Sequence, residues 1–280
     1  MKTRNNRANR YIFKISYYII LTVLSLTMIF PFYWMVVTAM KTPEELSVYP
    51  PSLLPKSLNL SNFKRVLSET EFLTYFLNSL FCAVTNTILV VIVTVLSAYG
   101  FYRFSIKGKK YIIHLLMLTN AIPFEIVMIL NYRMMISWNL YDNLWALIIP
   151  FICNFSFVYI LYDAFCSIPK SLVYASIIDK SSHLKFIRHV AIPHAKTALI
   201  YIIIINIVGS WNSFVWPMMI TNTSSSRTLP LGTYIYMPEY GSRTELVMAM
   251  SVFSEIPMAL LFILFQKMFI LKNDRASYAI

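Results

Sequence analysis

The chain has 280 residues, of which 58% are hydrophobic and only 13% charged, and its mean hydropathy is +0.63. A soluble domain carries about twice that charged fraction, so the composition argues against a soluble enzyme or binding domain. The formal net charge is +12, but the basic residues stand in short clusters between apolar runs, which is not the basic stripe of a nucleic-acid-binding domain. The chain is therefore predicted to be an integral membrane protein.

Six apolar runs are long enough to cross a bilayer, which takes about 20 residues as a helix. They lie at residues 15–40, 73–101, 111–134, 143–165, 196–220 and 246–271. The first run follows a basic start, but it is too long for a signal peptide and no small-residue cleavage site follows it. We expect it to remain as an anchor, and we expect an all-α fold with six transmembrane helices.

Lysine and arginine are unevenly distributed among the segments between these runs. If the N-terminus is cytoplasmic, the inside segments hold 17 of the 24 basic residues, which is a strong bias for short loops. Residues 1–14 and the tail 272–280 are then both predicted to be cytoplasmic. The external segment 41–72 is expected to run extended through its prolines and to end in a short helix capped by Ser61.

Five of the six runs contain a proline, and these are Pro31, Pro123, Pro150, Pro217 and Pro257. Proline bends a membrane helix and frees a carbonyl that neighbours or water must satisfy. The prolines could serve helix packing, or they could be hinges or walls of a moving pathway. Either way, a bundle of straight rods is not expected.

No motif in the chain predicts catalysis or a cofactor of its own. The phosphate-binding spacing G-x-x-x-x-G-K-[ST] is absent. No histidine lies at metal-ligand spacing, and the three cysteines, Cys82, Cys153 and Cys166, are interpreted as small apolar packing residues. The chain is expected to be a non-enzymatic membrane subunit, without a metal site.

A few polar residues within the runs are candidates for a wet pathway. A carboxylate in a span costs about 2.5–3.5 kcal/mol and faces water or the bundle interior unless it lies near an interface; Glu125 and Glu255 could be either. Trp211, Asn212 and Trp216 could form an interfacial belt or line a lumen. The alternative function is a proton-coupled secondary transporter that uses the two glutamates as carriers.

The segment from Pro169 to His194 is the most organised polar stretch of the chain. Apolar residues recur there at helical spacing, with a break near Lys180, which predicts two amphipathic helices on the cytoplasmic side. Such a pair could receive a soluble partner or could rest on anionic lipid headgroups. The spacing alone leaves both possibilities open.

Residues 168–182 read IPKSLVYASIIDKSS, with Phe186 and Ile192-Pro193 following. This stretch resembles the loop I-P-x-x-L-x-E-A-A-x-I-D-G-A-S of the permease subunits of carbohydrate-type ATP-binding cassette (ABC) importers, in particular the smaller permease of maltose-type systems. Further similarities follow in the family's order: Met40-Lys41-Thr42-Pro43, Phe76-Leu77-Asn78-Ser79, Ala98-Tyr99 with Arg103-Phe104, Ile122-Pro123, Trp211-Asn212 with Trp216-Pro217, Leu229-Pro230 and Phe265-Gln266-Lys267.

The chain departs from the family pattern at three positions. Tyr174 stands at the family's glutamate, Lys180 at its glycine, and Ser213 at its aspartate. If the turn at Lys180 requires a positive φ, a lysine there costs about 1 kcal/mol relative to glycine.

The resemblance implies a type I ABC importer permease, with a first span and external loop at 15–72 and a core of five spans at 73–271. It implies that the loop 168–194 is a coupling helix that inserts into a groove on a separate ATPase. The implied coupling residues are Leu172, Tyr174, Ala175, Asp179, Lys180, Ser182, Phe186 and Pro193. The candidate pathway residues are Asn78, Ser79, Glu125, Trp211, Asn212, Trp216 and Glu255.

The resemblance also implies partners. They are a second permease subunit, two ATPase subunits that bind the ATP, an extracytoplasmic sugar-binding protein and the lipids of a bacterial cell membrane, with no nucleic acid. The chain would then form half of the translocation pathway for a sugar or oligosaccharide. The sequence does not name that sugar.

Overall fold

The computed structural model describes residues 2–239 and 243–277, and the side chains of residues 13–236 and 243–266. Every regular element in this described part is helical, which confirms the all-α fold class. Three helices contain stretches long and apolar enough to cross a membrane unaided: α1 (Lys2–Ala39), α4 (Phe72–Arg103) and α15 (Thr244–Ser277).

Three further candidate spans are bent pairs of helices. The helix α5 (Lys109–Leu118) with the 3-10 turn η1 (Thr119–Ala121) meets α6 (Phe124–Ser137) at 91°. The helix α7 (Leu144–Ile148) with η2 (Ile149–Phe151) meets α8 (Phe155–Cys166) at 49°. The run of α10 (His183–Phe186), the π-helical η3 (Ile187–Ala191) and α11 (Ile192–His194) meets α12 (Lys196–Trp211) at 83°. Counting each pair as one span gives up to six in the described residues.

Prolines account for two of these bends. Pro123 directly precedes α6 and Pro150 lies within η2, where a missing N–H and the ring interrupt the helical ladder. Pro31 and Pro257 lie inside α1 and α15, which continue through them. The predicted run 196–220 is not one helix, because α12 ends at Trp211 and a short helix, α13 (Val215–Ile220), follows.

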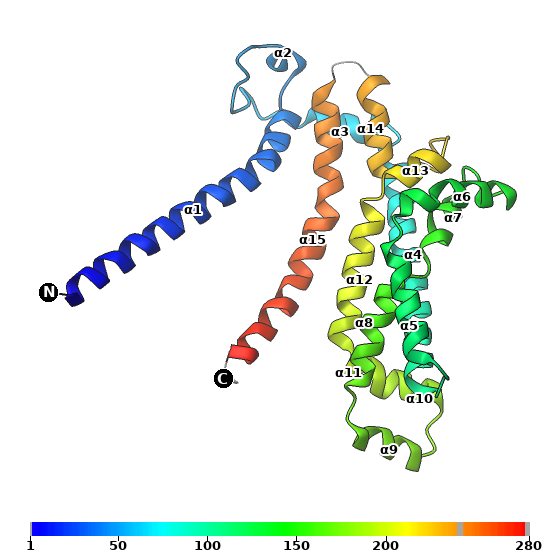
Figure 1. The fold of residues 1–280 in the computed structure, drawn as a ribbon. Coiled ribbons are helices and arrows are strands. Elements are labelled where there is room, and N and C mark those ends of the chain that lie inside the picture. Colours follow the sequence, from blue (N-terminus) through cyan, green and yellow to red (C-terminus); the bar gives the residue numbers. More distant parts are fainter. Residues whose placement is uncertain (1, 240–242, 278–280) are drawn as a thin grey trace. The chain divides into compact units, whose positions relative to one another are not determined.

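The chain forms two compact units. Unit 1 holds the residues up to Phe72 and those from Thr233 onward, and within it α15 packs on α1 and on α3 (Ser61–Glu69). Unit 2 runs from Leu73 to Gly232 and holds the bent pairs and the segment 168–194 (Figure 1). The contacts thus group the last helix with the first, whereas the predicted core placed it with residues 73–271.

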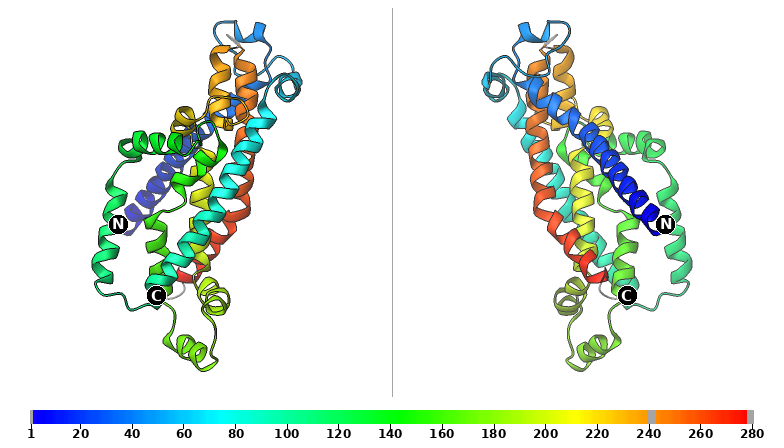
Figure 2. Two further views of the ribbon diagram at one scale, coloured as in Figure 1. Left: turned by 90° about the vertical axis from the view of Figure 1, so that its right-hand side faces the viewer. Right: turned by 90° about the vertical axis from the view of Figure 1, so that its left-hand side faces the viewer.

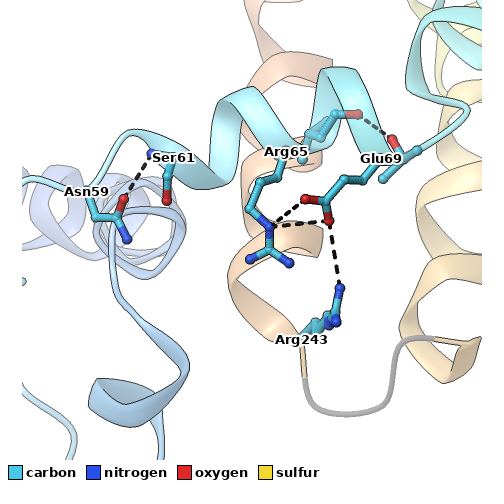
Figure 3. Close-up of polar contacts among 7 residues, drawn as sticks. Asn59, Ser61, Arg65, Glu69 and Arg243 are labelled. Carbon is cyan, nitrogen blue, oxygen red and sulfur yellow. Dashed lines mark hydrogen bonds and ion pairs between the residues drawn. The ribbon is translucent and has the colours of Figure 1, made fainter.

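The segment of unit 1 between α1 and α4 contains two short helices. Thr42 caps α2 (Pro43–Leu46) by accepting the Glu45 N–H. Ser61 does not cap α3, contrary to the prediction: it is the first helical residue, and its N–H donates to Asn59 Oδ1 at 2.9 Å (Figure 3). The side chain of Asn59, two residues before Ser61, therefore accepts the first N–H of the helix.

An ion-pair cluster links α3 to the residues that precede α15. Arg65 Nε lies 3.1 Å from Glu69 Oε1, and Arg243 lies 3.9 Å from the other oxygen of that carboxylate (Figure 3). The side chains are 30–46% exposed, so such pairs contribute little free energy. They orient α3 rather than hold the unit together.

The end of α1 is fixed by a buried amide. Asn62 Nδ2 donates to the carbonyls of Ala39 and Lys41, both at 2.9 Å. Lys41 is itself buried, and its ammonium donates to the Ser52 carbonyl and lies 4.6 Å from the Trp34 ring centroid. This cation is therefore paired with a carbonyl and a π face rather than with an acid.

Unit 2 contains two apolar clusters. One joins α4, α8 and the residues before and within α12, and includes Ala98, Phe165, Phe186, Ala191 and Ile202. The other lies around Trp216 and includes Cys82, Met135, Ala146 and Ile220. The first cluster anchors the segment predicted to couple, and the second lies directly before the loop 221–228 in the chain.

Candidate coupling surface and pathway residues

The helix α9 (Lys170–Ile178) ends in a turn that requires a positive φ. The Lys180 N–H donates to the Ile177 carbonyl and the Ser181 N–H to the Ser176 carbonyl, both at 3.0 Å, which is the Schellman pattern. Lys180 has φ 48°. The position of the family's glycine therefore does adopt the left-handed conformation, and here a lysine adopts it at a cost of about 1 kcal/mol.

No residue of α9 is buried. Tyr174 is 61% exposed and Ile178 80%, and Leu172 and Ala175 are also exposed. At 3.6 residues per turn, Tyr174, Ala175 and Ile178 share one face, opposite the face that lines a cavity within the unit. Figures 1 and 2 show α9 at one end of unit 2, beyond α10 and α11. An apolar face thus lies uncovered on a projecting helix.

The second half of the segment is anchored in the core. The Ser182 hydroxyl accepts the Lys185 N–H and caps α10. Phe186 is buried, with its ring stacked on Tyr102 at 6.5 Å and tilted against Tyr99 at 6.0 Å. A force applied to α9 would therefore reach α4, which carries both tyrosines, through close packing.

Two histidines and a π turn complete this anchor. His183 Nδ1 lies 2.7 Å from the Tyr99 hydroxyl, and His194 Nε2 lies 3.0 Å from the Ser167 hydroxyl at the end of α8. The π turn Ile187–Ala191 directly precedes Ile192-Pro193. Because Pro193 has no N–H to donate, the ladder is irregular at this point, as is common for π turns.

Asp179 and Lys180 are the exposed residues of the turn after α9. The predicted coupling residues therefore divide into two groups. Leu172, Tyr174, Ala175, Asp179 and Lys180 lie on the projecting arm, and Ser182, Phe186 and Pro193 lie on its anchor. Contact with an ATPase remains a prediction for the first group.

Asn78 and Ser79 hold the loop 221–228. Asn78 Nδ2 donates to the carbonyls of Ser225 and Arg227, both at 2.9 Å. The Ser79 hydroxyl accepts the Leu229 N–H at 2.7 Å. Both side chains are buried. Their observed contacts are structural, and a role in the pathway remains a prediction for them.

Asp142 fixes the same loop through further hydrogen bonds. Its carboxylate accepts the N–H groups of Asn222 and Thr223, at 2.7 and 3.1 Å, and the hydroxyls of Thr223 and Ser226. Burial would raise the pKa of Asp142, but the hydrogen bonds from Asn222, Ser226 and Thr223 outweigh it and lower the pKa to about 2. The sequence analysis missed this residue; its only signal was a short polar turn between two apolar runs.

Trp211 and Trp216 are both buried within unit 2. Trp211 packs edge-on against Phe76 at 5.6 Å, and Trp216 donates its Nε1–H to the Ala146 carbonyl at 2.9 Å. They therefore contact protein, whereas the sequence analysis weighed an interfacial belt against a lumen. Asn212 is exposed just after the end of α12, and it remains the better candidate for the pathway.

The two predicted glutamates lie on different helices and are both exposed in the structure. Glu125 is in the first turn of α6, where a carboxylate complements the helix dipole. Glu255 lies within α15, two residues before Pro257. Their roles in the pathway stay predictions.

Several polar groups within the helices were not singled out from the sequence. Asn206 of α12 donates to the Thr87 hydroxyl of α4 at 3.0 Å. Within the described part of the chain, Asn86 Oδ1 and the Thr94 hydroxyl, both on α4, are buried without a hydrogen-bond partner, as is the Glu245 carboxylate of unit 1. Polar residues inside or next to the apolar runs were the available signal. Their burial is what makes them candidates, since unpartnered polar groups are rare in a core.

Bent membrane helices, together with a projecting arm anchored between them, define the permease subunit of a type I ABC importer. A bacterial ABC transporter involved in the import of the acidic polysaccharide alginate contains a chain of the same fold, with a TM-score of 0.81 and 25% identity. The alignment covers 91% of this chain and 96% of that one. This confirms the predicted fold.

Residues 6–273 match the binding-protein-dependent transport system inner membrane component family, and the chain belongs to that family. A putative ABC transporter permease of Caldicellulosiruptor sp. (strain Rt8B.4) is 31% identical over 249 residues, 88% of this chain and 90% of the relative. The arabinooligosaccharides transport system permease of Bacillus subtilis (strain 168) is 25% identical over 262 residues, 92% and 93% of the two chains. The chain is therefore a multi-pass membrane permease, and nothing supports the secondary-transporter alternative.

Proposed function

We propose that this chain forms half of the translocation pathway of an ATP-driven importer for a sugar or oligosaccharide. The relatives support that substrate class, because they include permeases for arabinooligosaccharides and, in Agrobacterium fabrum, for sulfoquinovosyl glycerol. A second permease completes the pathway, two copies of a separate ATPase bind and hydrolyse the ATP, and an extracytoplasmic binding protein delivers the sugar. In this proposal both termini are cytoplasmic, which the distribution of basic residues supports.

The projecting helix α9 carries this proposal. Its outward face presents Tyr174, Ala175 and Ile178 to solvent, and exposed apolar residues grouped on a projecting helix are typical of a helix-in-groove contact. Its anchor at Phe186 is packed against two tyrosines of α4. A groove on the ATPase that covers the outward face would then move α9 and α4 together.

The chain contributes two alternative packings rather than chemistry. Closure of the ATPase dimer on ATP displaces α9 and favours one packing of the helices, and release favours the other. The bends at 91°, 49° and 83° supply short helical pieces that can shift against their neighbours without a straight span having to break.

Ala175→Asp tests the docking. It places a carboxylate on the outward face of α9, where docking would bury it unpaired at a cost of several kcal/mol. In the full importer reconstituted in vesicles, substrate-stimulated ATP hydrolysis and uptake should fall together, while the complex still assembles. Ser105→Asp is the matched control, since it adds the same charge at an exposed residue between α4 and α5.

Two results would overturn the proposal in different ways. Normal coupling in Ala175→Asp would show that α9 does not dock on the ATPase. Unimpaired coupling of the wild-type complex to solutes other than sugars, with no stimulation by a panel of mono- and oligosaccharides, would leave the docking intact and reject the substrate class.

A further inference from the structure

A cavity of about 230 Å³ lies behind the coupling helix, on the face of α9 opposite the proposed docking face. The end of α4, α9 and the start of α10 line it, and the lining includes Arg103, Lys180, Ser181 and His183. At roughly 30 Å³ per molecule of liquid water, the space would hold several waters or one small polar group. The proposed function does not use this cavity.

The charges around the cavity are unbalanced. Arg103 and Lys180 are cationic, whereas no acidic residue is among the lining. Asp179 precedes Lys180 in the chain but does not line the space. Among the residues whose side chains the structure describes, neither Arg103 nor Lys180 forms an ion pair. Two cations that converge on one cavity repel each other unless an anion lies between them.

The hydroxyl groups around the cavity suit a phosphate in particular. The buried Tyr99 hydroxyl lies 2.7 Å from His183 Nδ1 and also faces Arg103, so this tyrosine holds two of the basic residues in place. Ser176 and Ser181 add further hydroxyls to the lining. Arginine and hydroxyl donors around one space are the groups that bind phosphate oxygens.

Apolar residues adjoin this polar lining. Val173, Ile177 and Phe186 line the same cavity, and Phe104, directly after Arg103, is 55% exposed with its ring 5.8 Å from that of His183. A free phosphate ion needs no apolar neighbours, whereas the phosphate of a lipid is joined to a glycerol and acyl chains. Arg103 is also the last residue of a helix that can span the membrane, which is the level at which headgroups lie.

We propose that this cavity binds the phosphate group of an anionic phospholipid, and that the lipid thereby occupies the space between α4 and the coupling helix. The proposal does not depend on what the importer carries. It concerns a lipid held as a ligand, in contrast to α9 resting on the membrane surface.

Native mass spectrometry of the whole importer tests this binding. The complex is placed in nanodiscs of phosphatidylcholine with phosphatidylglycerol, extracted into detergent, and the retained phosphatidylglycerol is counted. Arg103→Gln and Lys180→Asn should each weaken retention about fivefold, the factor for one basic residue near an anionic surface. Lys180→Asn keeps a residue that tolerates the positive φ.

Lys107→Gln is the matched control, since it removes an exposed charge close to Arg103 in the chain from a residue that does not line the cavity. Its retention should equal that of the wild type. Equal losses in all three variants would indicate a diffuse surface charge and overturn the site, as would unchanged retention in both cavity variants with an intact complex.

Two further arms distinguish the source of the anion. Inorganic phosphate added to pure phosphatidylcholine nanodiscs should give no protection of Arg103 in hydrogen–deuterium exchange of the α4 end, whereas phosphatidylglycerol should. Protection by phosphate alone would overturn the lipid assignment. Retention of the lipid only in complexes stripped of the ATPase would show that a side chain of the partner fills the cavity, and would equally overturn it.

Discussion

At Gly232, close packing leaves no room for a side chain. A Cβ built at this position would lie 2.1 to 2.7 Å from three ring carbons of Tyr75, which is itself buried. Gly232→Ala therefore has to displace the ring, and we expect it to lower stability by about 1–3 kcal/mol. The measurement is the thermal unfolding of the purified protein in detergent.

Gly209→Ala is the control for that prediction. Gly209 lies in α12, and nothing lies within 4 Å of an added Cβ. Since alanine favours a helix over glycine by up to about 1 kcal/mol, Gly209→Ala should unfold at the same or a slightly higher temperature. A Gly232→Ala protein as stable as Gly209→Ala would show that Tyr75 has room to move.

Asp142 gives a prediction for pH. Its folded pKa of about 2 lies below the ordinary 3.8, so the ionised form stabilises the loop 221–228 above pH 4, and this contribution is lost as the pH falls toward 2. At neutral pH, Asp142→Asn should loosen the loop. The amide keeps one acceptor oxygen and tolerates the φ of 58°, but it loses the charge.

A cysteine at Ser224, in a background with Cys153 and Cys166 replaced by serine, reports this loosening through its rate of reaction with dithiodipyridine, which works in acid. The rate ratio of Asp142→Asn to wild type should be several-fold at pH 7 and approach one between pH 4 and 2. A ratio that is constant with pH would show that Asp142 does not fix the loop through its charge.

At the scale of a helix, the C-terminal turn of α9 is destabilised by the positive φ of Lys180. Lys180→Gly relieves the positive φ, so the turn should gain about 1 kcal/mol. The amides of Lys180 and Ser181, which close that turn, should exchange with deuterium about fivefold more slowly. Lys185→Gly makes the same substitution inside α10 and should speed exchange there instead. Faster exchange at residues 180–181 in Lys180→Gly would mean that the lysine side chain holds the turn.

For the whole molecule, the testable feature is which side of the membrane each loop faces. Single cysteines at Lys107 and Ser181 should react with a membrane-impermeant thiol reagent only from the cytoplasm, and one at Ser225 only from outside, because the basic bias orients the spans. Lys107 and Ser225 are exposed, and Ser181 is half-buried. The same background without Cys153 and Cys166 is used, because these are the exposed native cysteines; Cys82 is buried.

The labelling of the cysteine at Ser181 is the most informative of the three results. External labelling there would invert the topology and remove α9 from any cytoplasmic ATPase. It would leave the fold and the family membership untouched, since neither depends on orientation.

Local pattern predicted much of this molecule. The apolar runs and the break after α9 are encoded within a few neighbouring residues, so periodicity suffices to find them. The positive φ at Lys180 was raised only as a condition, through the family's glycine, because lysine itself does not favour that conformation. The bends at Pro123 and Pro150 follow from proline itself. The motif order from Met40 to Lys267 likewise predicted the family.

The tertiary structure decided the rest, because it depends on partners distant in the chain. Asn78 and Asp142 are ordinary polar residues until residues 222–229 fold back on them. Trp211 and Trp216 have the same spacing whether they face lipid, a lumen or a packed core, and only the approach of Phe76 and Ala146 shows that they are buried. The cavity behind α9 likewise exists only because Arg103, at the end of one helix, lies beside a turn that comes more than seventy residues later. Charge, hydropathy and turn chemistry are local and can be read from the chain, whereas burial and convergence are properties of the folded molecule.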